Sequence, residues 1–263
     1  MHPVAGPLHS IVIPAYNEAR RIGLTLDLIA AYLAAMPEPA EIIVVDDGSL
    51  DTTARVVQEK TATMPPNVQL TLLRHHPNRG KGAAVRQGCL AAQGHYILFT
   101  DADLATPIEE AQKLWDALDA GYDLAIGSRV QHDGRDMRSS QPLYRRLMGK
   151  LYHLLVTITA VRGITDTQCG FKGFTQEASK YLFGAQQLTG IVFDTELLFL
   201  AQQARMRIAQ APVEWSNVEG SRMRLSLGHA LMVLGDLISI RIRHMRRPTI
   251  APQAAKGPPS GLA

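Results

Sequence analysis

An alternation of apolar runs with amphipathic segments limits how this chain can fold more than any other feature of its sequence. The apolar runs have the length and composition of strands: 10–15, 41–45, 68–73, 96–100 and 123–127. The segments between them repeat apolar residues at helical spacing: 18–35, 51–61, 81–92 and 107–120. Strands joined by helices in this way lie parallel to their neighbours. We therefore predict an α/β fold with an open, mostly parallel twisted sheet flanked by helices.

The second half of the chain has weaker patterns. A polar segment without periodicity at 131–140 predicts a mobile loop. The elements predicted after it are a helix at 143–161, a strand within 168–175, a helix at 194–204, a strand within 207–215 and a helix from about 227 to 245. The predicted divisions of the chain are an N-terminal tail at 1–9, one domain at 10–226, an amphipathic helical segment at 227–247 and a disordered tail at 248–263.

Composition and charge argue against several classes of protein. The only cysteines are Cys89 and Cys169, too few for a disulfide scaffold, so we expect a reducing cytoplasmic location. A net charge of +3 is too small to indicate nucleic-acid binding. No apolar run is long enough to predict a membrane span, and the N-terminus lacks a secretory signal pattern. His75 and His76 have no third ligand at metal-binding spacing, so we predict that both lie on the surface.

Polar residues follow the predicted strands, at the edge of the sheet where open α/β folds bind their ligands. These clusters are 14–18, 46–49, 101–103 and 127–129. A further segment, 78–82, opens the third predicted helix. Its glycines permit close approach of the backbone to a ligand, and its Arg79 and Lys81 suit a phosphate. One cleft would gather all of these side chains.

Asp101 and Asp103 directly follow a buried strand. Side chains of an extended segment alternate between faces, so we predict that both carboxylates point the same way and bind one cation. Taken alone, such a pair is more often a helix cap or a solvated turn, and residues 46–48 have an equally plain interpretation as a turn. Segment 79–82 matches neither the Walker loop nor the dinucleotide-binding fingerprint. The position of the clusters at successive strand ends nevertheless favours a functional site.

Taken in order, these motifs resemble those of the inverting nucleotide-sugar glycosyltransferases of GT-A fold. The second half narrows the resemblance, because segments 166–172, 193–198 and 218–222 are similar to the dolichyl-phosphate β-glucosyltransferase branch of the polyprenyl-phosphate glycosyltransferases. The resemblance extends from about residue 10 to residue 247. It implies a GT-A type sheet domain followed by the C-terminal helical segment.

The resemblance also implies roles for individual residues. The nucleotide pocket would be lined by Pro14, Tyr16, Glu18, Val45 and Asp47. The segment Asp101, Ala102 and Asp103 would hold Mg²⁺ or Mn²⁺ against the diphosphate, with Arg222 near the donor. Arg129 would meet phosphate near the reaction centre, and either Arg145 or Arg146 would bind the acceptor phosphate. Asp166 and Gln168 would lie on the acceptor side, although a turn that ties down the fold is an equally good interpretation.

The reaction implied is a single in-line displacement that moves a hexose, expected to be glucose, from UDP-sugar to a polyprenyl phosphate. A phosphate nucleophile needs little help from a general base. A hydroxyl acceptor would need one, and Asp194 or Glu196 would then be the candidate. The alternatives are therefore a soluble GT-A enzyme with a hydroxyl acceptor, or a catalytically silent nucleotide-sugar binding protein.

The predicted C-terminal helix bears on the membrane. Its apolar stripe consists of Leu227, Leu231, Leu234, Ile238 and Ile242. This stripe would either pack on the domain or face lipid, and arginines near the end of the helix suit an anionic surface. We expect a peripheral enzyme on the cytoplasmic face of the membrane.

Overall fold

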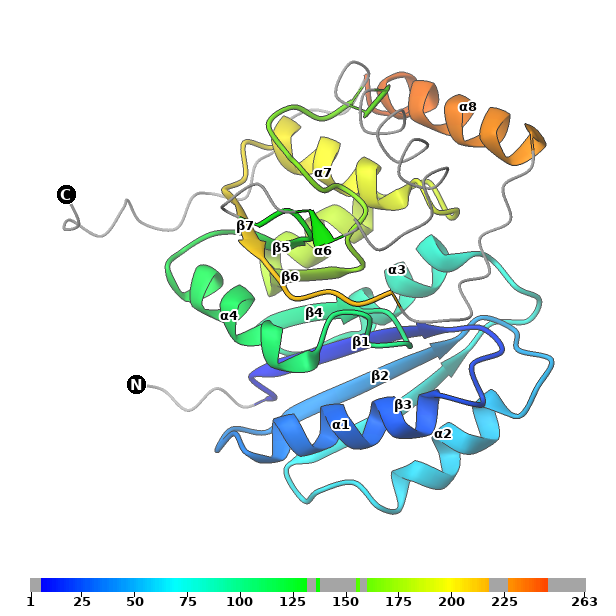
Figure 1. Ribbon diagram of the computed structural model, residues 1–263, viewed down its shortest axis with the longest axis vertical. Helices are drawn as coiled ribbons and strands as arrows, with labels where there is room; N and C mark the ends of the chain where they lie inside the picture. The colour runs from blue at the N-terminus through cyan, green and yellow to red at the C-terminus, as the bar shows by residue number, and fades with distance from the viewer. Residues whose placement is uncertain (1–5, 132–135, 138–154, 157–159, 218–226, 246–263) are drawn as a thin grey trace.

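The computed structural model describes residues 6–131, 136–137, 155–156, 160–217 and 227–245. Its centre is a seven-stranded sheet with the order β3-β2-β1-β4-β6-β5-β7 (Figure 1). The strands are β1 (His9–Ala15), β2 (Ala40–Asp46), β3 (Val68–Arg74), β4 (Tyr96–Thr100), β5 (Leu124–Ser128), β6 (Phe171–Thr175) and β7 (Ile208–Pro212). All neighbours are parallel except β6, which runs antiparallel to both β4 and β5. The predicted open, mostly parallel sheet is confirmed.

Helices cover both faces of the sheet. They are α1 (Ile22–Ala34), α2 (Thr53–Thr61), α3 (Lys81–Ala91), the 3₁₀ turn η1 (Ile108–Glu110) with α4 (Ala111–Asp119), α6 (Gln176–Ala185), α7 (Phe193–Gln203) and α8 (Leu227–His244). Because strand side chains alternate, Ile11 and Ile13 of β1 pack in the core with α1, α2 and α4. Val12 packs in the core of the opposite face with α3, α6, α7 and α8.

The strand β6 shows where the alternating pattern of the first half ends. The predicted strand at 168–175 is present, but it is inserted antiparallel between β4 and β5. It leads directly into α6, an element that the sequence patterns did not predict. The side-chain oxygen of Thr175 accepts a hydrogen bond from the backbone N–H of Ala178 and so caps this helix. A capping side chain therefore lets the chain pass from strand to helix without a loop.

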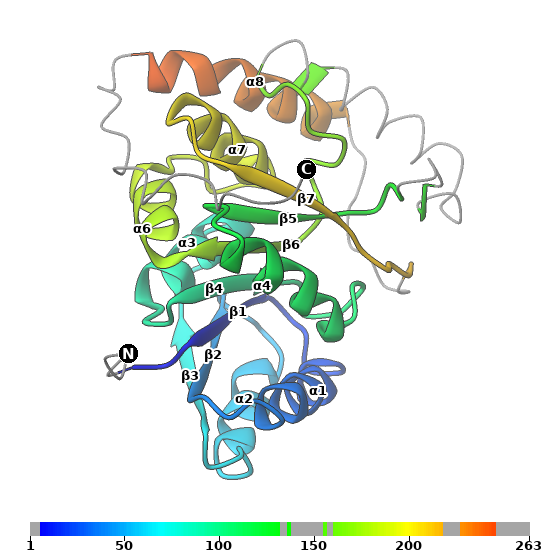
Figure 2. The ribbon, with the colours of Figure 1, turned by 90° about the vertical axis from the view of Figure 1, so that its left-hand side faces the viewer.

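The C-terminal helix α8 lies over α7 (Figure 2). Leu237 and Ile240 are completely buried in the core shared with α7. Ile238 and Ile242 point away from it and are 51% and 67% exposed. Of the predicted stripe, Ile238 and Ile242 are thus on the solvent side and Leu234 is half-buried, while other residues of the helix enter the core. The side chains of Leu227 and Leu231 lie outside the described part of the structure. Across the described residues, no helix is both long enough and apolar enough to span a bilayer.

Candidate active site

The loops that follow β1 and β2 are bonded to each other at the carboxyl edge of the sheet. The backbone N–H of Asn17 donates to Ser49 Oγ over 2.8 Å, and Asn17 Oδ1 accepts from the N–H of Leu50 over 2.7 Å. Asn17 adopts a positive φ of 54°, a conformation that asparagine tolerates better than most residues. The neighbouring Tyr16 is 39% exposed beside this turn. The two loops therefore form one rim, with an aromatic side chain accessible to a ligand.

The carboxylate of Asp47 is buried and forms hydrogen bonds within the protein. It accepts hydrogen bonds from the backbone N–H groups of Arg79 and Gly80, both 2.9 Å long, and His75 Nδ1 lies 2.6 Å from it. The prediction that His75 lies on the surface is wrong, since only 5% of it is exposed, whereas His76 is exposed as predicted. The Asp47 carboxylate thus fixes the loop before α3. Its predicted contact with a nucleotide stays a prediction.

Two further residues predicted to line the nucleotide pocket differ in exposure. The side chain of Val45 is completely buried in the core beneath α3, so a ligand could meet only its backbone. Pro14, its partner in the register between β1 and β2, is half-buried. Of the residues at these two strand ends, Tyr16 thus offers more accessible side-chain surface than Val45 does.

Lys81 and Asp101 meet where α3 and β4 come together. Lys81 is the first residue of α3, and its Nζ lies 2.6 Å from Asp101 Oδ1. Burial alone would lower the pKa of the lysine, but the charges of Asp101 and Asp194 outweigh it and raise the pKa above its usual value. Lys81 therefore carries a positive charge beside the predicted metal carboxylate.

Asp101 and Asp103 lie on a turn and not on an extended strand. The strand β4 ends at Thr100, and the N–H of Leu104 donates to the carbonyl of Asp101 over 3.2 Å. The prediction that Asp101 and Asp103 share a face because they lie on an extended segment is therefore wrong, although the two carboxylates do lie near each other. Burial, and then the negative charge of Asp101, raise the pKa of Asp103.

Arg21 joins this turn to the first loop. Its guanidinium lies 2.7 Å from Glu18 Oε2 and 3.8 Å from Asp103 Oδ2. The predicted site residues Glu18 and Asp103 are thus brought together through an arginine that the sequence patterns did not single out.

The donor set at this turn fits a hard divalent cation. The side chains of Asp101 and Asp103 are 39% and 29% exposed, so both can reach a ligand. Within the described ranges, no group of three acidic, histidine or cysteine side chains forms a closed metal cage. Mg²⁺ and similar cations are commonly held by one or two carboxylates together with substrate phosphates, and this open arrangement is of that kind.

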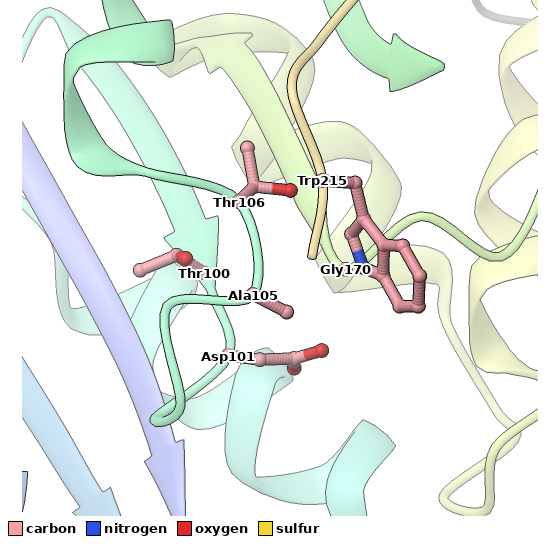
Figure 3. Close-up of a pocket in the computed structure, with 6 residues that line it drawn as sticks. All are labelled: Thr100, Asp101, Ala105, Thr106, Gly170 and Trp215. Atoms are coloured by element: carbon pink, nitrogen blue, oxygen red, sulfur yellow. The ribbon is translucent and has the colours of Figure 1, made fainter. Parts of the chain in front are cut away.

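A small recess lies beside Asp101, between β4 and the segment that follows β7 (Figure 3). It is lined by Thr100, Asp101, Ala105, Thr106, Gly170 and Trp215. Gly170 is in close contact with the carboxylate, because a Cβ at this position would lie 2.2 Å from Asp101 Oδ2. Neither Gly170 nor Trp215 was predicted as a site residue. Gly170 does belong to the motif at 166–172, but only the structure shows that it faces Asp101.

Arg129 is held by Asp166 in a bidentate ion pair. Its Nε and Nη2 donate to the carboxylate over 2.6 and 2.7 Å, and its backbone N–H donates over 3.0 Å. Burial alone would lower the pKa of Arg129, but this pairing raises it overall. The guanidinium also lies over the ring of Trp215, 5.7 Å from its centroid. Asp166 thus ties the end of β5 to the segment before β6, and it orients Arg129 beside the recess.

A second layer of charge lies beneath the site. Lys172 is completely buried, and its Nζ donates to Asp194 Oδ1 over 2.7 Å and to the carbonyl of Cys169. Burial raises the pKa of Asp194, and the lysines Lys172 and Lys81 offset this only in part. Asp194 is therefore close to the charges of the site, but it is bound to a lysine and 4% exposed.

Glu196, the other candidate base, is completely buried. Its carboxylate accepts from the backbone N–H groups of Gln187 and Leu188, and His244 Nε2 lies 2.7 Å from it. Three predicted site residues, Arg145, Arg146 and Arg222, lie outside the described residues, as do the tail at 248–263 and most of the predicted loop and helix between 131 and 161.

Comparison with known proteins places this geometry in a family. Residues 10–183 match the family model of glycosyl transferase family 2. The chain is 42% identical to a dolichyl-phosphate beta-glucosyltransferase of Trichomonas vaginalis over 243 residues, which cover 89% of this chain and 70% of the relative. It is 36% identical to the dolichyl-phosphate beta-glucosyltransferase of Homo sapiens over 250 residues, covering 90% and 75% of the two chains.

Solved structures share the fold. Glucosyl-3-phosphoglycerate synthase from Mycobacterium tuberculosis in complex with UDP aligns with a TM-score of 0.64 and 18% identity over 93% of this chain and 83% of that one. The same enzyme with Mn²⁺, UDP and glucosyl-3-phosphoglycerate aligns with a TM-score of 0.59 and 19% identity, over 93% and 82%. Together with the family match and the similarity to relatives across most of both sequences, this likeness shows that the chain belongs to glycosyl transferase family 2 and has its GT-A fold.

Proposed function

We propose that this protein transfers glucose from UDP-glucose to a polyprenyl phosphate of the dolichyl type, with the help of Mg²⁺ or Mn²⁺. Relatives that are 33–42% identical over about nine-tenths of the chain carry the name dolichyl-phosphate beta-glucosyltransferase. The observation in the molecule itself that carries the proposal is the group formed by Asp101, Asp103 and Lys81 at the carboxyl edge of the sheet. Two carboxylates for a cation and one ammonium for phosphate are what a diphosphate leaving group requires.

In this reaction a phosphate oxygen of the acceptor attacks the anomeric carbon as the bond from that carbon to the UDP oxygen breaks. The configuration inverts, and UDP leaves with the electron pair. A bound divalent cation would supply positive charge to the leaving diphosphate, held by Asp101 and Asp103. Lys81 would add a fixed positive charge on the same side, and Tyr16 would provide a ring against which the base can lie.

The burial of the candidate bases favours a phosphate acceptor over a hydroxyl acceptor. Asp194 is bound to Lys172, and Glu196 accepts two backbone N–H groups and contacts His244. Neither carboxylate is therefore poised to take a proton from a hydroxyl group at the site. An ionised phosphate needs no base, so this arrangement supports the phosphate nucleophile.

Turnover measured with matched acceptors tests the proposal. Purified protein should release UDP from UDP-glucose with Mn²⁺ when dolichyl or undecaprenyl phosphate is present, and should do so poorly with hydroxyl acceptors. Asp103→Ala should lose most of this turnover while keeping its fold, whereas Asp116→Ala, which changes an exposed acid on α4, should not. If EDTA leaves the rate unchanged, the metal role is wrong. Equal rates with phosphate and hydroxyl acceptors would contradict the lipid acceptor.

We further propose that the enzyme works at the cytoplasmic surface of a membrane through α8. Ile238 and Ile242 on this helix and Met245 directly after it are more than half exposed, and the neighbouring Arg241 and Arg243 are exposed as well. Each arginine near an anionic surface contributes about 1 kcal/mol, so these two contribute roughly 2 kcal/mol before any apolar insertion. Two free cysteines suit the reducing side of the membrane.

Flotation with liposomes tests this placement. The protein should float with anionic liposomes at low salt and dissociate from them at high salt, because salt screens the arginines. Ile242→Glu should weaken flotation without changing the fold, since this side chain is solvent-exposed. Protein that remains in the unbound fraction with anionic liposomes at low salt would contradict the proposal.

A further inference from the structure

The buried carboxylate of Glu196 belongs to a series of contacts that connects α8 with the proposed metal site. It lies in the first turn of α7 and is 0% exposed. Its Oε1 accepts from the N–H of Gln187 over 3.0 Å, and its Oε2 accepts from the N–H of Leu188 over 2.8 Å. Glu196 therefore fixes the backbone of segment 186–190, which is the first part of the connection between α6 and α7.

Segment 186–190 is in turn bonded to the start of α3. The carbonyl of Thr189 accepts a hydrogen bond from the N–H of Gly82 over 2.8 Å, and the side-chain amide of Gln186 donates to the carbonyl of Gly82 over 2.9 Å. The packing is close, because a Cβ at Gly80 would lie 2.5 Å from the oxygen of Thr189. The segment thus holds the glycines on both sides of Lys81.

The position of the Lys81 backbone determines where its side chain meets the proposed metal carboxylates. Glycine on each side leaves the backbone at Lys81 with more freedom than any other pair of neighbours would. Contacts from outside α3 must therefore set its position, and they come from segment 186–190 on one side and from Asp47, which accepts from the N–H of Gly80, on the other. From this position its ammonium lies 2.6 Å from Asp101.

The other end of the contact chain is the helix α8. His244 is 0% exposed, and its Nε2 lies 2.7 Å from Glu196 Oε1. On the same face of α8, Leu237 and Ile240 are buried against the domain. His244 is therefore the contact through which the docked helix reaches Glu196.

We propose that Glu196 is a positioning residue for the transfer reaction: it fixes segment 186–190, thereby places Lys81 against Asp101, and is itself held by His244 of α8. The proposal rests on the proposed function, since it gives Lys81 and Asp101 their roles at the diphosphate. It assigns Glu196 no contact with substrate. It also links the docking of the C-terminal helix to the geometry of the donor site.

Hydrogen exchange in the metal-free protein tests whether Glu196 fixes the backbone around Lys81. Glu196→Gln keeps the shape of the side chain but replaces one acceptor oxygen with an N–H₂ group, so at least one backbone N–H loses its acceptor. The amides of residues 80–82 should then exchange about tenfold faster, while those of β1 keep their rates. Leu200→Ala is the matched control, because Leu200 is buried one turn further along α7. Unchanged exchange at 80–82 in Glu196→Gln, or an equal increase in Leu200→Ala, would overturn the proposal.

A double-mutant cycle on UDP binding with Mn²⁺ tests the path through Lys81. Lys81→Met and Glu196→Gln should each weaken binding about tenfold, and the double variant should be no weaker than Lys81→Met alone. Fully additive losses would show that Glu196 does not act through Lys81. His244→Leu should weaken binding in the same direction, and His244→Gln, which keeps an N–H donor, should restore it. A wild-type protein that fails to bind UDP with Mn²⁺ would refute the proposed function, while the exchange experiment would still decide the role of Glu196.

Discussion

Replacing Gly170 with alanine should damage catalysis far more than folding. A Cβ at this position would lie 2.2 Å from Asp101 Oδ2 and 2.7 Å from its Cγ. Unbonded carbon and oxygen atoms pack at more than 3 Å, so the carboxylate would have to retreat by about 1 Å. Gly170 does not adopt a positive φ, so the backbone itself accepts alanine without strain.

The expected size of the effect follows from this displacement. A shift of about 1 Å in a catalytic group can lower the rate by about 10²-fold, which corresponds to roughly 2.7 kcal/mol of transition-state stabilisation. The ion pair of 2.6 Å between Asp101 and Lys81 would be lost as well. The Asp101 side chain is 39% exposed and can swing toward solvent, so we expect the free energy of unfolding to fall by less than about 1 kcal/mol.

Gly173→Ala in β6, three residues further along the chain, provides the matched control. A Cβ there would lie 3.4 Å from Leu114 Cβ, which is an ordinary packing distance. We would measure UDP release from UDP-glucose with a polyprenyl phosphate acceptor, UDP binding with Mn²⁺, and thermal unfolding for both variants. Should Gly170→Ala retain wild-type turnover, or lose no more than Gly173→Ala does, the placement of Asp101 against Gly170 is not what supports catalysis.

Two further predictions follow from buried polar groups. Asp166→Asn leaves the charge of Arg129 without its partner and should lower the free energy of unfolding by about 3 kcal/mol, which corresponds to a loss of roughly 6 to 12 °C in Tm. The double variant Arg129→Met with Asp166→Asn should recover part of this stability. An Asp166→Asn variant as stable as wild type would contradict the bidentate pair. Burial raises the pKa of Cys169 to about 11, so the thiol stays protonated in the folded protein while the unfolded chain ionises from its ordinary value of 9.0. Stability should therefore fall by about 2 to 3 kcal/mol as the pH rises from 9 to 11, and Cys169→Ala should lack this component in chemical denaturation; an unchanged pH dependence in the variant would contradict it.

Local patterns in the sequence were enough to predict most of the fold. The apolar runs that became β1 to β5 and the amphipathic segments between them are set by spacing along the chain, which depends only on nearby residues. The polar clusters after the strands were also predictable, because parallel strands bring their carboxyl ends to one edge. The sequence therefore placed Asp101, Asp103 and the start of α3 with Lys81 at the same edge, as the structure has them, although it did not predict the turn that holds the two carboxylates.

Contacts between distant residues were decided only by the tertiary structure. Arg129 and Asp166 are 37 positions apart, and no spacing rule says that one will clamp the other. The same holds for the contact of Gly170 with Asp101 and for the contact of His75 with Asp47. The burial of His75 contradicts the prediction that it lies on the surface. These pairs depend on how β6 is inserted between β4 and β5 and on which loops then touch.

The C-terminal helix shows the same division between local and tertiary information. Its sequence determined that α8 is a helix with apolar residues on much of its surface, because helical spacing is a local property. Only the packing decided that Leu237 and Ile240 enter the core while Ile238 and Ile242 stay exposed. The physical reason is that the hydrophobic effect is non-directional: an apolar side chain gains free energy from leaving water whichever apolar surface it packs against. The sequence therefore specifies that apolar residues are buried, and the tertiary structure decides which face of the helix is buried.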